Sequence, residues 1–369
     1  MTVLLPPSPG EGMDVFFNAR SIAVIGASSE FTKIGGRPIH LLRKYGYSGD
    51  IYPINPKGGT IQGLPAYASV LDTPTAPDLA ILAVPVEATL QAVRDCAKRG
   101  VRGVIVLTSG FAEAGPEGID LQAELVRVAR SHGMRLLGPN CLGTVNVVDK
   151  LVGSFSIALE QNMPPAGHVG IVSQSGNIGS FTMSNMAQRG LGVSRFIATG
   201  NEADVDVADG LLYLTGQAQV KVILLYIEGV RDGVRFLEGL RRAHAAGQAV
   251  VAIKLGRTAV GSAAAASHTA ALAGSDAVAD AVLRQFGAYR AQSIEEFFDI
   301  ACAAAVAGMP RNGRTGIVTV SGGVGVLLAE SLPPPQALSA AASTQAASRA
   351  LGWVGDNMGR LSPPPPSEM

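Results

Sequence analysis

The sequence predicts an α/β protein built on parallel sheets. Short, continuous apolar runs alternate with segments of helical periodicity from residue 21 onward, a pattern typical of parallel strands covered by helices on both faces. Glycine contributes 45 residues and aromatic residues only 5% of the chain, which favours tightly packed strand–helix units over an all-β fold. With 369 residues, 47% of them hydrophobic, the chain is long enough for two or three domains.

A first domain is predicted over residues 1–150 from five apolar runs separated by helical segments. The predicted strands cover residues 21–26, 51–54, 79–84, 104–108 and 134–138. Helical spacing of apolar residues fills the intervals, as in 86–99 and 121–132. This alternation predicts a Rossmann-like parallel sheet, in which ligands bind at the carboxyl ends of the strands.

The strand pattern starts again after a proline-containing loop at 161–167. A second, flavodoxin-like parallel α/β domain is predicted over residues 151–300, with strands at 168–173, 193–198, 220–227 and 249–254. The heptapeptide GIVSQSG at 170–176 is similar to GIVTVSG at 316–322, which indicates the start of a third, incomplete flavodoxin-like unit over residues 301–330. Residues 331–369 are rich in proline, serine and alanine, and we expect them to form a disordered tail.

Charge and cysteine usage exclude several classes of protein. Lys plus Arg equals Asp plus Glu at 29 each, and without a basic stripe we expect no nucleic-acid partner. No run reaches the ~20 apolar residues of a membrane span, and the first twenty residues lack the apolar core of a signal peptide. The three cysteines Cys96, Cys141 and Cys302 are far apart, so neither a disulfide framework nor a metal site is expected. Reduced thiols predict a cytoplasmic protein.

The ends of the predicted strands in the first domain carry a candidate phosphate-binding site. Gly26, Ala27 and Ser28 form a glycine-containing turn after the first strand, where backbone N–H groups can face a phosphate. Lys57 follows the second strand, where an NAD-binding domain would place an acidic residue. A lysine here suits an additional phosphate better than a ribose, although a tight turn with an exposed lysine is a structural alternative.

Three further strand ends add small, polar or turn-forming residues to the same edge of the sheet. These residues are Val84, Pro85, Ser109, Gly110 and Asn140. Each of these residues, taken alone, is of a type common in loops. Because the carboxyl ends of parallel strands share one edge, together they predict one binding site.

The second domain carries a candidate nucleophile, His268. It lies in a loop of almost exclusively small residues, 261–274, which would let a substrate or partner approach the imidazole closely. A nucleophilic histidine needs an acceptor on its second ring nitrogen. Glu228 follows the apolar run 222–227 and is a plausible acceptor, because it would lie at the carboxyl edge of the sheet.

Five motifs in fixed order resemble a known family. IAVIGAS at 22–28, NPKGG at 55–59, AVPV at 83–86, TSGF at 108–111 and GPNCLG at 138–143 resemble the CoA-binding part of the succinyl-CoA synthetase α-subunit family. The likeness is greater to its ADP- or NDP-forming acetyl-CoA and acyl-CoA synthetases, and covers about residues 13–330. The segment 200–206 also resembles a family loop, to which no role is assigned.

The resemblance implies roles for the candidate residues. Coenzyme A would contact the turn Gly26–Ser28, Lys57, Val84–Pro85 and Ser109–Gly110, and Asn140 would shape the thiol end of the site. His268 would carry a phosphoryl group and Glu228 would orient it, whereas no nucleophilic role follows for Cys141. Ser173, Gln174, Ser175 and Gly176 match the helix N-terminus beneath the phosphate, where N–H groups stabilise an anion.

The implied function is acid–thiol ligation through a phosphohistidine relay. A small carboxylic acid and CoA would be joined at the expense of ATP, with Mg²⁺ and nucleotide supplied by an ATP-grasp β-subunit or domain that this sequence lacks, and an oligomer is expected. The sequence leaves open the acid used and the choice between ADP and GDP. Two alternatives remain: a non-catalytic CoA-binding regulatory module, whose relatives tend to lack the histidine, and an NAD-dependent oxidoreductase, which would require the missing acidic residue.

Overall fold

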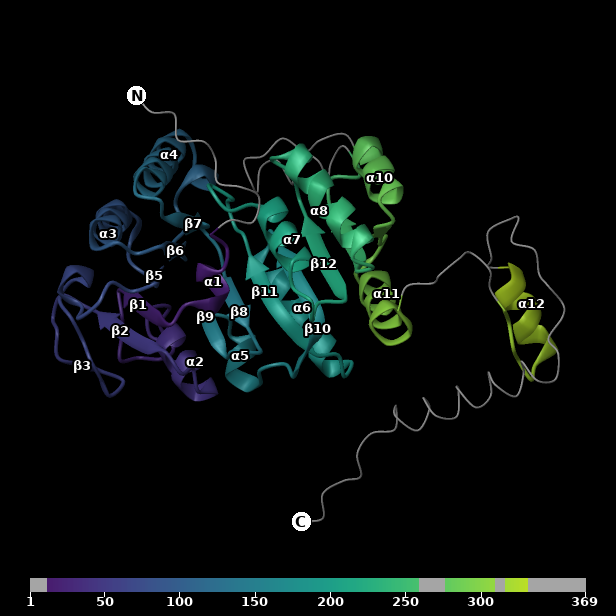
Figure 1. Cartoon of the computed structure of the whole chain (residues 1–369), viewed down its shortest axis with the longest axis horizontal. Helices are drawn as coiled ribbons and strands as arrows, with labels where there is room; N and C mark the ends of the chain where they lie inside the picture. The colour runs from purple at the N-terminus through teal and green to yellow at the C-terminus, as the bar shows by residue number, and fades with distance from the viewer. Residues whose placement is uncertain (1–11, 259–275, 309–315, 331–369) are drawn as a thin grey trace, which may run out of the picture. The chain divides into compact units, whose positions relative to one another are not determined.

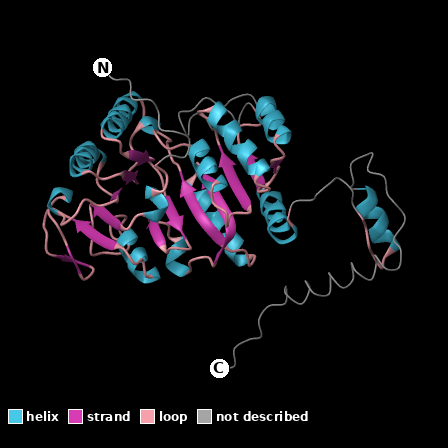
Figure 2. Cartoon of the chain, in the orientation of Figure 1, coloured by secondary structure: helices cyan, strands magenta, loops and turns pink. Residues whose placement is uncertain are grey.

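The computed structural model describes residues 12–258, 276–308 and 316–330. The chain divides into two compact units, residues 1–309 and residues 310–369. The first unit holds a five-stranded sheet, a seven-stranded sheet and a two-stranded hairpin, with helices packed on the sheets (Figures 1 and 2). The predicted α/β class is therefore confirmed.

The first sheet is entirely parallel and has the order β2-β1-β5-β6-β7. Its strands are β1 Ser21–Ile25, β2 Asp50–Ile54, β5 Leu79–Leu82, β6 Gly103–Val106 and β7 Arg135–Leu137. The crossovers include α2 Arg37–Tyr45, α3 Val86–Arg99 and α4 Pro116–Ser131, and the short elements are η1 Val70–Asp72 and η2 Ala112–Ala114. Strand order reverses between β1 and β5, which is the position where open α/β sheets bind ligands.

The second sheet has the order β14-β13-β12-β10-β11-β8-β9. Its parallel strands are β10 Ala166–Ser173, β11 Val193–Ala198, β12 Val222–Ile227, β13 Ala249–Lys254 and β14 Tyr289–Arg290. Two pairs of helices pack on it: α6 Gly176–Gln188 with α11 Ile294–Ala307, and α7 Val207–Thr215 with α8 Gly233–Ala245. Helix α10 Asp276–Gln285 contacts β14. The strands predicted for both domains are confirmed, with ends that differ by at most two residues.

Short strands were missed by the sequence pattern. The antiparallel hairpin of β8 Gly143–Asn146 and β9 Leu151–Ser154 pairs with the edge strand β11, and β3 Thr60–Ile61 pairs with β4 Leu64–Pro65. The change of sheet therefore falls between Leu137 and Gly143, earlier than the domain boundary expected at residue 150. The hairpin belongs to the second sheet because its backbone completes that sheet's edge.

The expected third unit also differs from the structure. Residues 301–307 belong to α11, which packs on β12 and β13 of the second sheet. Within 316–330, the described residues form no strand and instead contain the helix α12 Gly322–Glu330. A single apolar segment cannot form a stable strand without neighbours to pair with. The tail expected at 331–369 lies outside the described residues.

The two sheets share a hydrophobic core. Ile22 and Val24 of β1 join a cluster that continues into the second sheet, whereas the alternate residues Ala23 and Ile25 join a second cluster against α3 and α4. Alternation along a strand sends successive side chains to opposite faces. Helix α1 Val15–Asn18 contacts both β6 and β8, so it packs the first sheet against the second. No helix in the described part of the chain is long and apolar enough to cross a membrane.

Candidate active site

The turn after β1 lies against the end of β5, at the reversal in strand order. Gly26 has a φ of +85°, and a methyl group there would lie 2.4 Å from the carbonyl oxygen of Ala83. The amides of Gly26 and Ala27 both donate to the carbonyl of Ile54 at 3.1 Å. Only glycine tolerates this backbone angle and this contact together, so the predicted turn has a structural requirement for Gly26.

The loop after β2 presents the predicted lysine. The Asn55 side chain donates to the carbonyl of Ala27 at 2.9 Å, and its Oδ1 accepts from the Lys57 amide at 3.0 Å. Lys57 is exposed and makes no ion pair with any residue that the structure describes. Its position beside the Gly26–Ser28 turn suits a phosphate-bearing ligand.

The loops after β5 and β6 are joined to each other. Thr108 Oγ1 donates to the carbonyl of Val84 at 2.6 Å, and Pro85 begins α3 as its N-cap residue. Ser109 is exposed, whereas the Gly110 amide donates to Glu113 Oε1 at 2.6 Å. The Gly110 amide is therefore already engaged within its own loop, and Ser109 is the polar group that faces solvent here.

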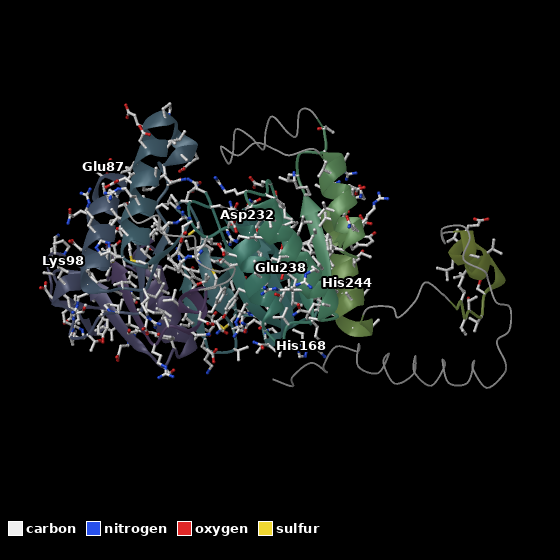
Figure 3. All side chains as sticks on the ribbon, turned by 45° about the horizontal axis from the view of Figure 1, so that its top comes forward. Glu87, Lys98, His168, Asp232, Glu238 and His244 are labelled. Carbon is white, nitrogen blue, oxygen red and sulfur yellow. The ribbon has the colours of Figure 1, made fainter. Side chains whose placement is uncertain are left out.

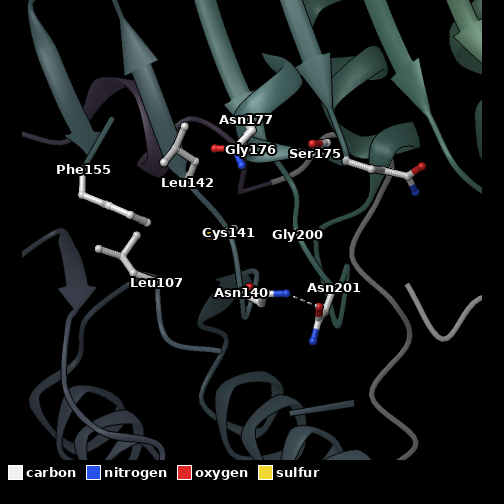
Figure 4. Close-up of a pocket in the computed structure, with 11 residues that line it drawn as sticks. Leu107, Asn140, Cys141, Leu142, Phe155, Ser175, Gly176, Asn177, Gly200 and Asn201 are labelled. Atoms are coloured by element: carbon white, nitrogen blue, oxygen red, sulfur yellow. Dashed lines mark hydrogen bonds between the residues drawn. The ribbon is translucent and has the colours of Figure 1, made fainter. Parts of the chain in front are cut away.

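Asn140, in the loop after β7, lies where the two sheets meet. Its amide donates to the carbonyl of Thr108 at 2.9 Å, and its Nδ2 donates to Asn201 Oδ1 at 3.3 Å. Both asparagines line a cavity of about 260 Å³ (Figure 4). The cavity is lined by Leu107, Asn140, Cys141, Leu142, Phe155, Gln174, Ser175, Gly176, Asn177, Gly200 and Asn201. It thus brings the predicted thiol end of the CoA site to the predicted phosphate-binding segment.

Cys141 lines this cavity as a thiol. It is fully free of disulfide bonding and buried, with Sγ 3.5 Å from the carbonyl oxygen of Val106. Burial raises the pKa of Cys141 to about 12. Because only a thiolate is a good nucleophile, this raised pKa disfavours a nucleophilic role for Cys141.

The N-terminus of α6 forms the polar end of the cavity. Ser175 is its N-cap and accepts a hydrogen bond from the Ile178 amide at 3.4 Å, while Ser173 Oγ donates to the Ser175 carbonyl at 2.6 Å. Among the described residues, the amides of Gly176 and Asn177 have no hydrogen-bond acceptor. Such N–H groups and the positive end of the helix favour a bound anion.

The Gln174 side chain is hydrogen-bonded to the backbone directly after β12, where Glu228 lies. Its Oε1 accepts hydrogen bonds from the backbone amides of Glu228 and, at 3.0 Å, of Gly229. Its Nε2 donates to the Gly229 carbonyl at 2.8 Å and to Glu202 Oε2 at 2.7 Å. The side chain is fully engaged, so Gln174 positions the site, and its side chain has no free group for a phosphate.

Glu228 is buried directly after β12. Two ionisable side chains near it respond to its charge. Burial and the charge of Glu228 together raise the pKa of Tyr226 to about 12. Burial lowers the pKa of Lys254, which the negative charges of Asp276 and Glu228 oppose. Glu228 thus occupies the predicted place at the carboxyl edge of the second sheet.

Glu202 is a buried carboxyl whose role the sequence did not reveal. Thr199 Oγ1 donates to its Oε1 at 2.9 Å, and Arg231 Nε lies 3.8 Å from its Oε2. Burial and the nearby Asp206 together raise the pKa of Glu202 to about 8. The resemblance of 200–206 to a family loop was the available signal, but a loop match alone does not show that Glu202 reaches Gln174.

The predicted nucleophile His268 lies outside the described residues. Of the other histidines, His132, His168 and His244 are exposed, and Figure 3 shows His168 and His244 among the surface side chains of the second domain. The described residues contain no cluster of His, Cys, Asp and Glu that could hold a metal ion. The structure therefore brings together Asn140, the N-terminus of α6, Gln174 and Glu228, and leaves the place of His268 a prediction.

Comparison with known proteins identifies the two domains. Residues 20–146 match a family model described as a CoA binding domain, and residues 166–304 match one described as a succinyl-CoA ligase like flavodoxin domain. The chain is 40% identical over 320 residues to the alpha subunit of the ADP-forming acetate–CoA ligase II of Pyrococcus furiosus, covering 87% of this chain and 68% of that one. It is 39% identical to the ADP-forming acetate–CoA ligase I of Archaeoglobus fulgidus, covering 86% of this chain and 45% of that protein.

A solved structure shows the same fold. The dinucleotide-forming acetyl-coenzyme A synthetase 1 of Ca. Korarchaeum cryptofilum superposes with a TM-score of 0.79 at 36% identity, covering 86% of this chain and 67% of that one. The similarity to the Pyrococcus alpha subunit is at a comparable level of identity and also covers most of both chains. The chain belongs to the family of the alpha subunits of ADP-forming acetate–CoA ligases.

Proposed function

We propose that this chain is the CoA-binding, phosphate-carrying component of an ADP-forming acyl-CoA synthetase. The observation that carries the proposal is the cavity between the sheets, where Asn140 of the CoA-type domain faces the N-terminus of α6. Behind that helix, Gln174 fixes the strand end of Glu228. A thiol, a carboxylate and a phosphoryl group must meet in such a reaction, and the nearness of Asn140 to the N-terminus of α6 supports this cavity as the meeting point.

The first step is phosphorylation of His268. One ring nitrogen attacks the γ-phosphorus of ATP, the bond from that phosphorus to the bridging oxygen breaks, and ADP leaves. Glu228 accepts a hydrogen bond from the other ring nitrogen and so fixes the tautomer. The burial of Glu228 and the hydrogen bond from its amide to Gln174 support this orienting role.

The second and third steps use the cavity. A carboxylate oxygen of the acid attacks the phosphorus of the phosphohistidine, the N–P bond breaks, and an acyl phosphate forms. The amides of Gly176 and Asn177 stabilise the phosphoryl oxygens. The CoA sulfur then attacks the acyl carbon, phosphate leaves, and the thiol proton leaves with it. Asn140 and Asn201 lie where the thiol would enter.

A second component supplies the nucleotide. Related chains are named alpha subunits, which implies a partner subunit. We propose that the partner contains an ATP-grasp domain that binds ATP with Mg²⁺ and that the two assemble into an oligomer. The cytoplasmic location expected from the free cysteines stays a prediction.

The proposal is tested by reconstitution. Calorimetry of the chain alone should detect CoA binding, and ATP, CoA and acetate should give acetyl-CoA only after a nucleotide-binding subunit of this family is added. CoA binding without any acyl-CoA formation in the reconstituted mixture would favour the regulatory module. Binding of NADH in place of CoA would favour an oxidoreductase.

A further inference from the structure

A second cavity lies behind the apolar end of the first. It measures about 190 Å³ and shares three lining residues, Leu142, Phe155 and Asn177, with the cavity of about 260 Å³. These shared residues form a partition between the two spaces. A change in the partition would therefore change the length of ligand that the first cavity accepts.

The first cavity has a polar side and an apolar side. Leu107, Leu142 and Phe155 gather on one side, away from Asn201 (Figure 4). No charged side chain appears among the described residues that line it. An acid with its carboxylate at the N-terminus of α6 would thus direct its carbon chain toward Leu107 and Phe155.

Phe155 is the partition residue that has room to change. Leu142 is fixed by close packing, because a methyl group at Gly176 would lie 2.9 Å from its Cβ, and Asn177 belongs to the first turn of α6. Phe155 directly follows β9, is half-buried, and is held through its backbone carbonyl, which accepts from Arg37 Nη1 at 3.3 Å. Its ring can be shortened without removing that hydrogen bond.

The space behind Phe155 can accept an apolar chain. The hydroxyls of Ser156 and Ser180 are paired at 2.6 Å, and the guanidinium of Arg37 is held by Glu160 and by the carbonyl of Thr32. These polar groups satisfy one another, so a hydrocarbon entering beside them would not leave a buried charge unpaired. Ile157 and Ala158 supply apolar surface in the same cavity.

We propose that Phe155 is the specificity-determining residue that sets the maximum length of the acyl chain. The inference rests on the proposed function and deepens it, since it names the size class of acid. With Phe155 in place, the ligand is confined to a cavity of about 260 Å³, slightly below the roughly 300–1,000 Å³ of sites for drug-sized molecules. The preferred acids are therefore short ones, and the space lined by Ile157 and Ala158 is an unused extension.

The test compares acids of increasing length. With the nucleotide-binding subunit, ATP and CoA present, kcat/KM is measured for straight-chain acids from acetate to octanoate. The native chain should lose activity beyond a short acid, and Phe155→Ala should shift the limit to longer acids, with gains on the order of tenfold for each methylene newly admitted. Phe155→Leu should shift the chain-length limit by less, and it replaces the alanine variant in the test if that variant folds poorly. Phe181→Ala, which removes an exposed ring of α6, should leave the profile unchanged.

Phosphate labelling separates this inference from the proposed function. Transfer of the γ-phosphate of ATP to the chain precedes entry of the acid, so both Phe155 variants should be labelled like the native chain. Normal labelling with an unchanged acid profile would overturn the role of Phe155. Absence of labelling in the native chain would overturn the proposed function itself.

Discussion

Glu202 connects the two parts of the candidate site through a single side chain. Its Oε2 accepts from Gln174, whose Oε1 accepts from the Glu228 amide. The adjacent Asn201 donates to Gln122 at 3.0 Å and its carbonyl accepts from Arg231 at 2.9 Å. A change at Glu202 would thus be transmitted to the cavity wall and to the strand end of Glu228.

Glu202→Gln should alter the dependence of stability on pH. The pKa of Glu202 is raised from 4.5 to about 8 because the carboxyl is buried and lies near Asp206. Between these two values the folded chain keeps a proton that the unfolded chain loses, so the native chain becomes less stable as pH rises through this window. Glutamine does not titrate and should remove that part of the slope.

Thermal unfolding of both proteins between pH 4.5 and pH 9 measures this effect. As pH rises toward about 8, the Tm of Glu202→Gln should rise relative to the Tm of the native chain. Above that pH the difference should level off. Parallel curves across the whole range would show that Glu202 is not held in its protonated form.

At the scale of single residues, some predicted positions depend on contacts that the sequence pattern does not contain. Gln174 was predicted to bind phosphate because Ser173–Gly176 resembles the family's phosphate-binding helix N-terminus, whereas its side chain is hydrogen-bonded to residues 28 and 55 positions away. Contacts between strand ends depend on sheet order, which local pattern does not contain. Glu228 was predictable because a carboxylate that ends an apolar strand must lie at the carboxyl edge.

The N-terminus of α6 is the element on which phosphate stabilisation depends. Ser175→Ala removes the hydrogen bond to the Ile178 amide and should lower stability by about 0.5–1 kcal/mol. Ser175→Asp keeps an acceptor for that amide but places a negative charge beside the phosphate. Stability of Ser175→Asp should be close to native, while labelling of the chain by ATP should fall by roughly tenfold or more.

Urea unfolding and initial rates of phosphate labelling are the two measurements for the Ser175 variants. Loss of stability and loss of labelling in the same proportion for both variants would mean that the helix N-terminus acts only through folding. Labelling that is unaffected in Ser175→Asp would place the phosphate elsewhere.

Gly26, in the turn after β1, has a matched control in Gly100, the C-cap residue of α3. Gly26 and Gly100 have φ angles of +85° and +87°, but a methyl group at Gly100 would meet no atom within 4 Å. Both alanine variants carry the cost of the backbone angle, about 1–2 kcal/mol. Gly26→Ala should lose a further 1–3 kcal/mol or so from its contact with Ala83 and should bind CoA more weakly, as chemical unfolding and calorimetry would show. If Gly26→Ala and Gly100→Ala weakened CoA binding equally, the turn after β1 would not be part of the CoA site.

At the scale of elements, long strands were predictable and short ones were not. The runs 193–198 and 249–254 coincide with β11 and β13. The second is apolar from Ala249 to Ile253, and the first is buried throughout although it contains Ser194 and Arg195. The hairpin of β8 and β9 was missed because strands of four residues with glycine and asparagine give little periodic signal. Its assignment to the second sheet depends on pairing with β11, a tertiary contact.

At the scale of the whole molecule, a buried ion-pair cluster joins the two sheets. Asp204, in the loop before α7, accepts from Arg135 Nε of β7 at 2.9 Å and from Arg130 Nε of α4 at 3.0 Å. Arg135 also contacts Asp209 of α7 at 3.0 Å. The backbone of the same loop is hydrogen-bonded to Leu136 and Gly138, so Asp204 and its loop tie β7 and α4 to the start of α7.

Asp204→Asn should destabilise the chain strongly. Removing one partner of a buried ion pair costs about 3–5 kcal/mol, and Arg135 is buried at 7% exposure. Asp299→Asn is the control, since its pair with Arg189 is exposed and should contribute at most about 1 kcal/mol. Chemical unfolding gives both values, and the apparent KM for CoA should rise only in Asp204→Asn. Equal stability losses in the two variants would contradict the proposed link between the sheets.

The central claim is that His268 carries the phosphoryl group, and one labelling experiment tests it. The chain is incubated with a nucleotide-binding subunit, Mg²⁺ and ATP radiolabelled at the γ-phosphate, and acid-labile label on the chain is counted. The native chain and His244→Asn, which changes an exposed histidine of α8, should both be labelled, whereas His268→Asn should carry no label. Label that survives in His268→Asn would contradict the phosphohistidine relay.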